Sequence, residues 1–339
     1  MRCKLGTEQV PFGERVAFKF KEWLKRRIPS PLLFPLLRLR GSILNTREGL
    51  RDARRHRRFG GPGESVFHTG WSSVHLEAQL TRDYHRVEKG LSLPVPRQPF
   101  GKEVAHRLAV GLRAVDDNSA DYVAFSRTAL DALNRWNIAC EIDKAISTPI
   151  TRDSTWGPIV RAENVSLFEH FFTSRRSVRG FAPEKLDMSV VRKSVGLAIN
   201  TPSVCNRQAF RVHAFTDRDE IESVLSLQNG NRGFRETVPV ALIITVDARK
   251  FAGPSERNQR WVDGGMFAMT LGWALHAMGV ASCYLNWSMT SDQTAKLRRA
   301  ARIPEHEDVV TLMAIGWAPD VFRVARSPRR ALGEVLQEH

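Results

Sequence analysis

The apolar residues in the first half of the chain recur at helical spacing. Three stretches, Ser73 to Val87, Lys102 to Val115 and Ala120 to Ile146, repeat apolar positions every three to four residues, as helices do when they bury one face. A shorter pattern predicts an amphipathic helix at Glu14 to Arg27, with an apolar face of Val16, Ala17, Phe20, Trp23 and Leu24. No alternating pattern typical of a strand occurs between residues 65 and 148. The first half is therefore predicted to be mostly helical.

The second half alternates between helical and strand patterns. Helices are predicted at Ser166 to Ser174 and at Met188 to Ile199, the latter with Asp187 as its N-cap. Four short apolar runs predict strands: Arg211 to Thr216, Pro239 to Val246, Val280 to Leu285 and Asp308 to Ile315. This alternation predicts an α+β fold, with a small mixed or antiparallel sheet flanked by helices.

One predicted helix carries almost no charge. Asp263 to Met278 is apolar on nearly all sides. A helix of this kind is buried, either in a core or in an interface between subunits.

Breaks in the pattern divide the chain into three predicted parts. A basic arm spans residues 1–60 and ends at the Phe59 to Gly63 segment, whose glycines and proline suit neither a helix nor a central strand. A helical extension follows at residues 61–160. Residues 161–339 form the α+β domain.

Composition indicates a globular protein in a reducing compartment. The chain has 339 residues, 42% of them hydrophobic, and its four cysteines form neither a CxxC pair nor a metal-binding spacing. No apolar signal segment is visible at the N-terminus. The longest candidate span, Ile28 to Leu44, is interrupted by prolines and arginines and is too short to cross a bilayer. A cytoplasmic protein is expected.

The net charge of +15 is concentrated at the N-terminus. Residues 1–60 hold sixteen Lys and Arg against five Asp and Glu. Such an arm could meet an anionic membrane, nucleic acid or an acidic partner. Basic residues beside Phe20 and Trp23 are what an interfacial helix needs, so peripheral contact with an anionic membrane through residues 14–58 is one interpretation. A terminal helix packed on its own domain, or a partly disordered arm, is the favoured alternative. Nucleic-acid binding lacks any recognisable motif.

A segment around His85 allows two interpretations. His85 and Glu88 are three residues apart, so they share a helix face and could bind a metal, but no third ligand is evident. The favoured interpretation is a helix C-terminus, with Gly90 as its left-handed cap and Pro94 soon after.

The most informative candidate chemistry lies at Arg175-Arg176-Ser177-Val178-Arg179-Gly180. Three guanidinium groups and a hydroxyl in one short turn can neutralise and hydrogen-bond a phosphate. An exposed basic stretch is the alternative for such a run taken alone.

Four motifs in order resemble the FMN-dependent nitroreductase family. The arginine motif is followed by Pro202-Ser203-Val204-Cys205-Asn206-Arg207-Gln208, which is similar to the family's Pro-Ser-x-x-Asn-x-Gln segment. The third and fourth are Gly279 to Trp287 and Ala314 to Pro319, the last followed by Ser327-Pro328-Arg329-Arg330. The resemblance covers about residues 165 to 336. It implies a nitroreductase-like fold, two subunits intertwined as a homodimer, and FMN at the subunit boundary.

The resemblance also implies roles for individual residues. Arg175 and Ser177 would hold the FMN phosphate, Arg179 would face the N1/O2 edge of the ring, and Arg176 would assist. Either Arg329 or Arg330 would close over the phosphate.

The remaining flavin contacts implied by the resemblance come from three segments. Pro202, Ser203, Val204 and Asn206 would reach the flavin from the partner subunit. The backbone at Leu285 and Asn286 would donate an N–H to N5. Gln228 or Asn231, in a Gly/Asn loop, would touch the edge of the ring; an ordinary surface loop is the alternative. Cys205 and Cys283 are expected to be packing residues, because no histidine adjoins either to activate it.

The activity implied is hydride transfer from NAD(P)H through flavin N5 to a small-molecule acceptor, with no catalytic side chain required. The N-terminal extension and the Cys205-Asn206-Arg207-Gln208 and Leu285-Asn286-Trp287 variants resemble family members associated with exopolysaccharide synthesis. The alternative is a catalytically inactive nitroreductase-fold scaffold or assembly protein at the membrane surface.

Overall fold

The computed structural model describes residues 30–61, 71–151, 154, 159, 161–325 and 327–339. The chain divides into two compact units, Met1–Arg54 and Arg55–His339. The amphipathic helix predicted at Glu14 to Arg27 lies outside the described residues. The predicted domain boundaries at residues 60 and 160 stay predictions.

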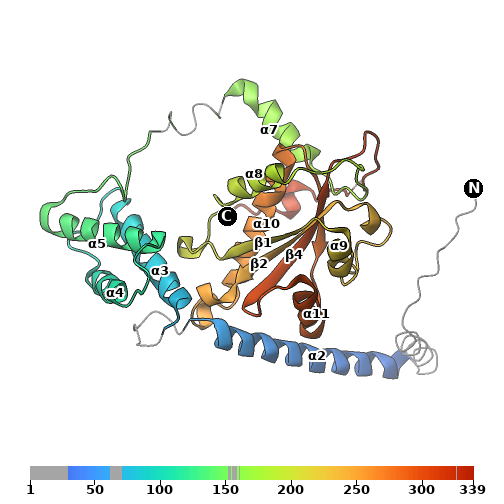
Figure 1. Ribbon diagram of the computed structural model, residues 1–339, viewed down its shortest axis with the longest axis horizontal. Coiled ribbons are helices and arrows are strands. Elements are labelled where there is room, and N and C mark those ends of the chain that lie inside the picture. Colours follow the sequence, from blue (N-terminus) through green and yellow to red (C-terminus); the bar gives the residue numbers. More distant parts are fainter. Residues whose placement is uncertain (1–29, 62–70, 152–153, 155–158, 160, 326) are drawn as a thin grey trace, which may run out of the picture. The chain divides into compact units, whose positions relative to one another are not determined.

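A single long helix, α2, spans Ser30–Phe59 (Figure 1). It contains Pro35 near its start. The sequence analysis does not predict this helix, because prolines and arginines interrupt the apolar run from Ile28 to Leu44. Within the described ranges, the structure has no helix that combines the length and hydropathy needed to span a membrane.

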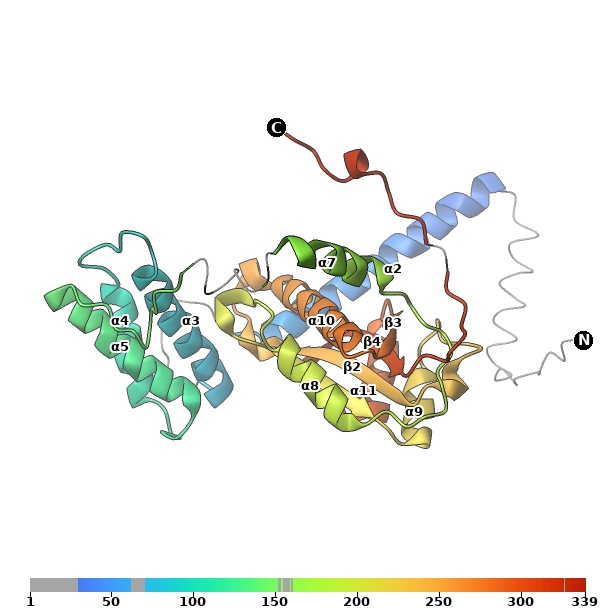
Figure 2. The same ribbon diagram turned by 90° about the horizontal axis from the view of Figure 1, so that it is seen from above.

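Three helices of the N-terminal extension pack on one another (Figure 2): α3 (Ser73–Leu91), α4 (Lys102–Arg113) and α5 (Asp121–Ala139). Their shared core includes Leu80, Val87, Leu108 and Leu133. All three were predicted. The predicted continuation of the last helix to Ile146 is wrong, because Cys140 adopts a left-handed backbone conformation and ends it.

The predicted role of Gly90 is also wrong. α3 continues through Gly90 to Leu91, and the N–H of Ser92 caps it by bonding to the Glu88 carbonyl. A Cβ at position 90 would lie 2.5 Å from the ring of Phe100. Glycine is therefore needed here for the close approach of an aromatic ring, and not for a left-handed turn.

The second half forms a four-stranded antiparallel sheet with strand order β1-β2-β4-β3 (Figure 1). The strands are β1 (Phe210–Phe215), β2 (Val240–Asp247), β3 (Ala281–Asn286) and β4 (Glu307–Gly316). Each lies within one residue of its predicted bounds. The α+β fold with a small sheet is confirmed, and the sheet is antiparallel.

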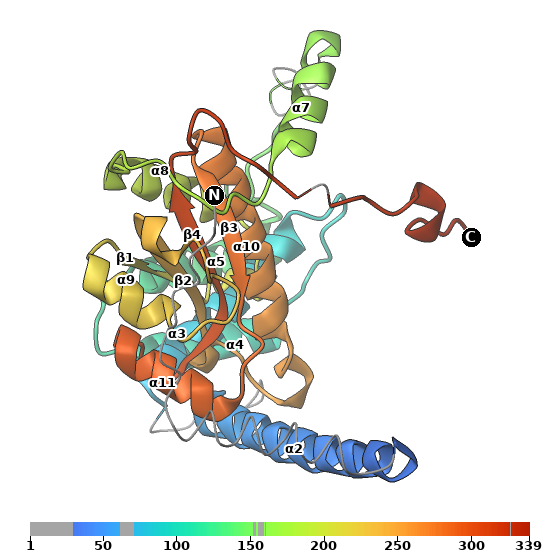
Figure 3. The same cartoon turned by 90° about the vertical axis from the view of Figure 1, so that its right-hand side faces the viewer.

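Helices cover both faces of this sheet. α9 (Arg218–Leu225) and α11 (Ser291–Ala301) pack on one face, whereas α8 (Met188–Ala198) and α10 (Gln259–Ala277) pack on the other (Figure 3). Along β4, Leu312 and Ala314 join the first core and Met313 and Ile315 the second, because alternate side chains of a strand point to opposite faces. The helix predicted at Met188 is confirmed, with Asp187 as its N-cap. α9 and α11 were not predicted.

The close packing of α10 on β3 gives a test of the fold. A Cβ at Gly272 would lie 1.9 Å from the hydroxyl oxygen of Tyr284, and that hydroxyl donates to the Ala268 carbonyl at 2.8 Å. We expect Gly272→Ala to lower the free energy of unfolding by about 1–3 kcal/mol through overpacking. Gly196→Ala on α8 is the matched control, because an added Cβ there would have no neighbouring atom within 4 Å. Equal stability of the two variants in urea unfolding would contradict the packing described here.

Candidate functional site

The arginine motif begins where α7 (Ala162–Ser174) ends. The chain then runs extended beside the start of β3. Ser177 forms a parallel bridge with Ser282, and the N–H of Val178 donates to the Ser282 carbonyl at 3.1 Å. The buried Val178 anchors the segment. The motif is thereby fixed to the sheet, with arginines on both sides of the anchor.

Arg175 has a guanidinium group with unused hydrogen-bonding capacity. It lies over the ring of Trp273, with 6.0 Å between the guanidinium carbon and the ring centroid. Its Nη1 is buried, yet has no hydrogen-bond partner among the described residues. Burial raises the pKa of the nearby Tyr284 to about 12, while the charge of Arg175 acts in the opposite direction. A buried N–H without a partner is costly, so this position suits an added anion.

The other two arginines of the motif are exposed. Nη1 of Arg176 turns back to its own backbone and donates to the Arg175 carbonyl at 3.0 Å. The positive charge of Arg179 favours the thiolate of Cys283 and so acts to lower its pKa, but burial has the larger effect. Burial raises the pKa of that thiol, so Cys283 is a packing residue in the protonated state, in agreement with its predicted role.

A second group of predicted residues meets at the end of β3. Nε2 of the buried Gln228 donates to the Asn286 carbonyl at 3.0 Å. Oε1 of Gln228 accepts from the Gly230 N–H at 2.6 Å and from Nδ2 of Asn231 at 2.9 Å. The structure therefore ties the Gly/Asn loop to the Leu285–Asn286 backbone.

Asn231 has a more constrained position than the prediction implied. Its side chain is fully buried, and Nδ2 also donates to the Leu225 carbonyl at 2.7 Å. Its Oδ1 has no partner among the described residues. The exposed Asn286 accepts at its own Oδ1 from the hydroxyl of Ser288.

The Pro202–Gln208 segment forms a separate turn around the short helix η1 (Val204–Asn206). Cys205, Asn206 and Gln208 all have left-handed backbone conformations. The turn is held by Ser203, whose Oγ accepts from the Gln208 N–H at 3.0 Å. The N–H of Val204 donates to Asp263 near the start of α10, also at 3.0 Å. Asn206 and Pro202 are exposed.

This turn and the arginine motif contact opposite ends of α10. Asp263 binds the turn, whereas Trp273 lies under Arg175. Ten residues of helix between them correspond to about 15 Å. Within one chain, the structure thus brings Arg175 to Arg179 together with β3, but does not bring Pro202 to Asn206 to them.

Arg329 and Arg330 lie apart from both groups. The segment after β4 runs away from the sheet (Figure 2). Arg330 pairs with Glu334 at 3.1 Å, and Arg329 donates to the Ser327 carbonyl, so these two side chains bond within the C-terminal segment. Neither arginine reaches the other predicted phosphate ligands.

A buried ion network connects the extension to the Pro202–Gln208 turn. Glu256 accepts from Arg207 at 2.8 and 2.9 Å and from Arg82 of α3 at 3.1 Å. Both arginine side chains are almost fully buried. Close by, Lys250 pairs with Glu77 of α3. Sequence reasoning missed this network; the only signal was Arg207 inside the motif.

A cavity of about 370 Å³ lies between this turn and the extension. Tyr84, Tyr122 and Phe125 line one side of it, and Asn206 and Arg211 lie among the residues on the other. Phe125 is 55% exposed and contacts Tyr84 edge-on. Three aromatic rings facing polar groups give a pocket suited to a small molecule.

The metal interpretation of His85 gains no support. Nδ1 of His85 hydrogen-bonds to Glu88 at 3.2 Å. Among the described residues, no group of three or more His, Cys, Asp or Glu is arranged to hold a metal ion.

Comparison with known proteins finds a family to which the α+β part is similar. A family model described as Nitroreductase family matches residues 172–231 and 219–317. Residues 172–317 are therefore similar to the nitroreductase family. The matched part includes Arg175, the Pro202–Gln208 turn and the end of β3, but not Arg329, Arg330 or the N-terminal extension. No curated protein matches the chain.

Several solved nitroreductases are similar to about half of the chain. An FMN-dependent nitroreductase from Clostridium difficile has 17% identity and a TM-score of 0.43, covering 50% of this chain and 99% of its own. A putative nitroreductase from Desulfovibrio desulfuricans, solved in complex with FMN, has 20% identity and a TM-score of 0.44, covering 50% and 95%. A nitroreductase family protein from Streptococcus pneumoniae has 16% identity and a TM-score of 0.44, covering 51% and 100%.

Proposed function

We propose that the protein is an FMN-dependent oxidoreductase that transfers hydride from NAD(P)H to a small-molecule acceptor. The observation that carries this proposal is the buried Nη1 of Arg175, which has no partner among the described residues and lies in the family-matched segment. An FMN phosphate would supply the missing acceptor. Bound FMN would supply the hydride chemistry, so the protein's own groups need only bind and orient.

The residues around Arg175 fit this cofactor. Arg175 and Ser177 would hold the phosphate, with Arg176 assisting. The exposed Arg179 would face the N1/O2 edge, where a cation stabilises the charge of reduced flavin. The Leu285–Asn286 backbone, positioned by Gln228, would supply the N–H at N5. Arg329 or Arg330 would contribute only if the C-terminal segment closes on binding.

We extend the proposal to a homodimer. One face of α10 exposes four large apolar side chains: Trp261, Val262, Met266 and Met269. An exposed apolar patch of this kind marks an interaction surface. A two-fold axis beside α10 would bring the Pro202–Asn206 turn of one subunit to the Arg175 end of the other. That pairing would also place the aromatic cavity beside the partner's flavin, where it could receive the acceptor.

The interface can be tested on that helix. Met266→Asp/Met269→Asp is expected to convert the dimer to a monomer, because it would bury two charges without partners. The mass in solution, by size-exclusion chromatography with light scattering, would show the change. Ile138→Asp on α5, at an apolar residue that is even more exposed, is the control and should remain dimeric. A monomeric wild-type protein would rule out the shared site.

The cofactor proposal is tested by the visible absorption spectrum of the purified protein. Flavin bands, with FMN released on denaturation, are the expected result. NADH and NADPH would then be compared as donors. A colourless protein that does not take up FMN would contradict the proposal and favour the inactive scaffold.

We propose that the acceptor is connected with cell-surface polysaccharide synthesis, on the strength of the N-terminal extension and the Cys205–Gln208 and Leu285–Trp287 variants. Loss of surface polysaccharide in cells lacking the protein would be the expected result. Unchanged polysaccharide would contradict the link.

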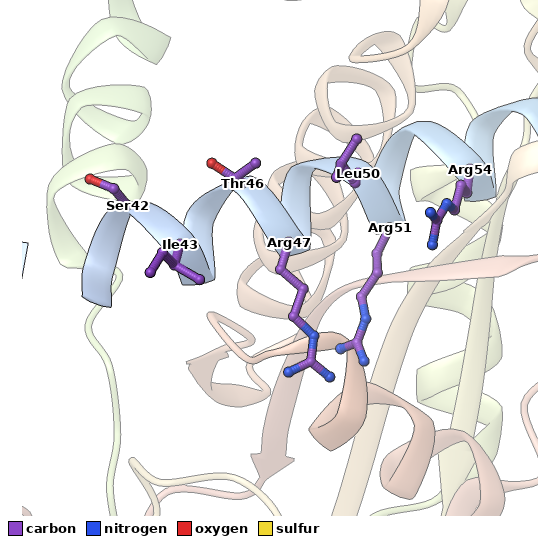
Figure 4. A pocket seen from close by; sticks show the side chains of 7 residues that line it. All are labelled: Ser42, Ile43, Thr46, Arg47, Leu50, Arg51 and Arg54. Atoms are coloured by element: carbon purple, nitrogen blue, oxygen red, sulfur yellow. The ribbon is translucent and has the colours of Figure 1, made fainter. Parts of the chain in front are cut away.

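Peripheral contact with an anionic membrane is proposed for the basic arm. Seven side chains on one face of α2 line an open depression of about 550 Å³ (Figure 4). Ile43 and Leu50 are 60% and 53% exposed there, beside Arg47, Arg51 and Arg54. Apolar and basic groups on one helix face suit an interfacial position. Co-sedimentation with anionic but not neutral vesicles is the expected result, and equal binding to both would contradict it.

A further inference from the structure

Five arginines line one pocket at the C-terminal end of α11. Its volume is about 420 Å³, and of the described residues that line it, Glu305 alone is acidic. Two arginines come from the last turns of α2, two from the last turn of α11 and one from the residue that caps α11: Arg55, Arg58, Arg298, Arg299 and Arg302. None of these residues belongs to the proposed flavin site.

Behind the lining residues Arg55 and Arg298 lies a buried group, called the floor here, that adds Asp308 and Arg260 and holds more positive than negative charge. Asp308, with its side chain 3% exposed, is the carboxylate shared by three arginines: Arg260 at 3.1 Å, Arg298 at 3.5 Å, and Arg55. Arg55 and Arg298 also donate to the Glu307 carbonyl. One carboxylate cannot neutralise three guanidinium groups, so the floor retains positive charge.

The rim is only weakly neutralised. Arg58 pairs with Glu305 at 2.9 Å, and both side chains are about two-thirds exposed. Arg302 pairs with Glu220, also at the surface. Exposed pairs of this kind contribute little and exchange partners readily. Arg299 is exposed and has no hydrogen-bond or ion-pair partner among the described residues.

The carboxylate of Glu307 does not change this balance. It accepts from His213 and Thr245 on the neighbouring strands. With Glu307 included, the pocket and its surroundings hold four carboxylates and six guanidinium groups. The carboxylates are Glu220, Glu305, Glu307 and Asp308, and the guanidinium groups are those of Arg55, Arg58, Arg260, Arg298, Arg299 and Arg302. Burial and the charge of Arg55 lower the pKa of Arg298 to about 10, so the arginine stays charged at neutral pH while its surroundings oppose that charge.

Helix electrostatics explain part of the cluster. Arginines in the last turn of α11 complement the partial negative charge of a helix C-terminus. That effect does not explain why α2 adds two more arginines to the same pocket. Guanidinium groups converging from two elements match the geometry in which arginine binds phosphate oxygens.

We propose that this pocket binds a phosphate-type oxyanion, carried either by a soluble phosphoester or by a lipid headgroup. Arg299, Arg302 and Arg58 contact the oxyanion from the rim, and the floor supplies the attractive potential. The site is independent of flavin binding.

Titration calorimetry of the full-length protein with inorganic pyrophosphate tests the site. We expect Arg58→Ala/Arg299→Ala/Arg302→Ala to weaken binding at least 10-fold. These three side chains are exposed, so the fold should persist; the single Arg299→Ala variant, expected to lose about threefold, guards against a folding defect. The matched control is Arg57→Ala, an exposed neighbour on α2 that does not line the pocket. It should bind within twofold of wild type.

A second arm separates the two sources of phosphate. Vesicles containing phosphatidylglycerol are compared with neutral phosphatidylcholine vesicles. Pyrophosphate binding that depends on the pocket arginines supports a soluble phosphoester. Binding only to anionic vesicles, lost in the triple variant but not in Arg57→Ala, supports a headgroup. The proposal is overturned if neither probe binds, or if Arg57→Ala weakens binding as much as the triple variant does.

Discussion

Replacing Arg175 with alanine is expected to weaken FMN binding about 10- to 100-fold. The guanidinium is held over Trp273, and its buried Nη1 has no acceptor among the described residues. A hydrogen bond to a charged group contributes about 1.5–3 kcal/mol, which corresponds to that range of affinity. Quenching of FMN fluorescence during titration measures the dissociation constant directly.

Two other arginines make this result specific. Arg176→Ala should have a smaller effect, because the guanidinium of Arg176 already donates to the Arg175 carbonyl. Arg192→Ala removes an exposed arginine of α8 outside the motif and should leave the affinity unchanged. If Arg175→Ala bound FMN as tightly as wild type, the FMN phosphate would have to lie elsewhere. The protein could then still bind flavin, but Arg175 would not be its phosphate ligand.

The strands and most helices could be predicted because their patterns are local. β2 is buried along its whole length, and its run of Val and Ile marks it in the sequence. Asp187 precedes α8 as a capping residue and does cap it. α11 was missed because its sequence, with charges on most sides and only Leu297 and Ala301 buried, lacks a clear apolar face. Cys140 ends α5 through a backbone conformation that its sequence does not indicate.

The candidate site was predicted through motif order, and only part of it is assembled within one chain. Arg175 and Ser177 meet β3, and Gln228 meets Asn286, as segments far apart in sequence. The Pro202–Asn206 turn lies at the other end of α10 from Arg175. The sequence pattern does not predict this distance between the two segments. Asn231 illustrates a further limit: its Nδ2 already donates to hydrogen bonds that only the folded loop creates.

The Glu256 network could not be predicted, because its members lie on three separate segments. Arg82 is on α3, Arg207 is in the Pro202–Gln208 turn, and Glu256 follows β2. None has an unusual local sequence. Yet the network connects the helical extension to a turn that we place in the flavin site, which gives the extension a structural role in that site.

Glu256→Gln is expected to cause the largest loss of stability, about 3 kcal/mol or more, because it leaves two buried arginines without their counter-charge. For a unit of this size, the thermal midpoint should fall by roughly 6–12 °C. Glu184→Gln, at an exposed residue of the α7–α8 connection, is the control and should change it little. A Glu256→Gln variant as stable as wild type would mean that the network does not hold the extension in place.

The pH dependence of this difference identifies its electrostatic origin. Burial alone would raise the pKa of Glu256, but the hydrogen bonds and charge of Arg207 outweigh it and hold the pKa below its ordinary value of 4.5. A carboxyl with a lowered folded-state pKa stabilises the fold fully above its unfolded-state pKa, and loses that contribution as the pH falls through the folded-state pKa. The gap in unfolding free energy between wild type and Glu256→Gln should therefore be constant above about pH 5.5 and shrink below pH 4.5. Urea unfolding between pH 7 and pH 3 measures it. A gap that does not change with pH would assign the loss to packing instead of charge.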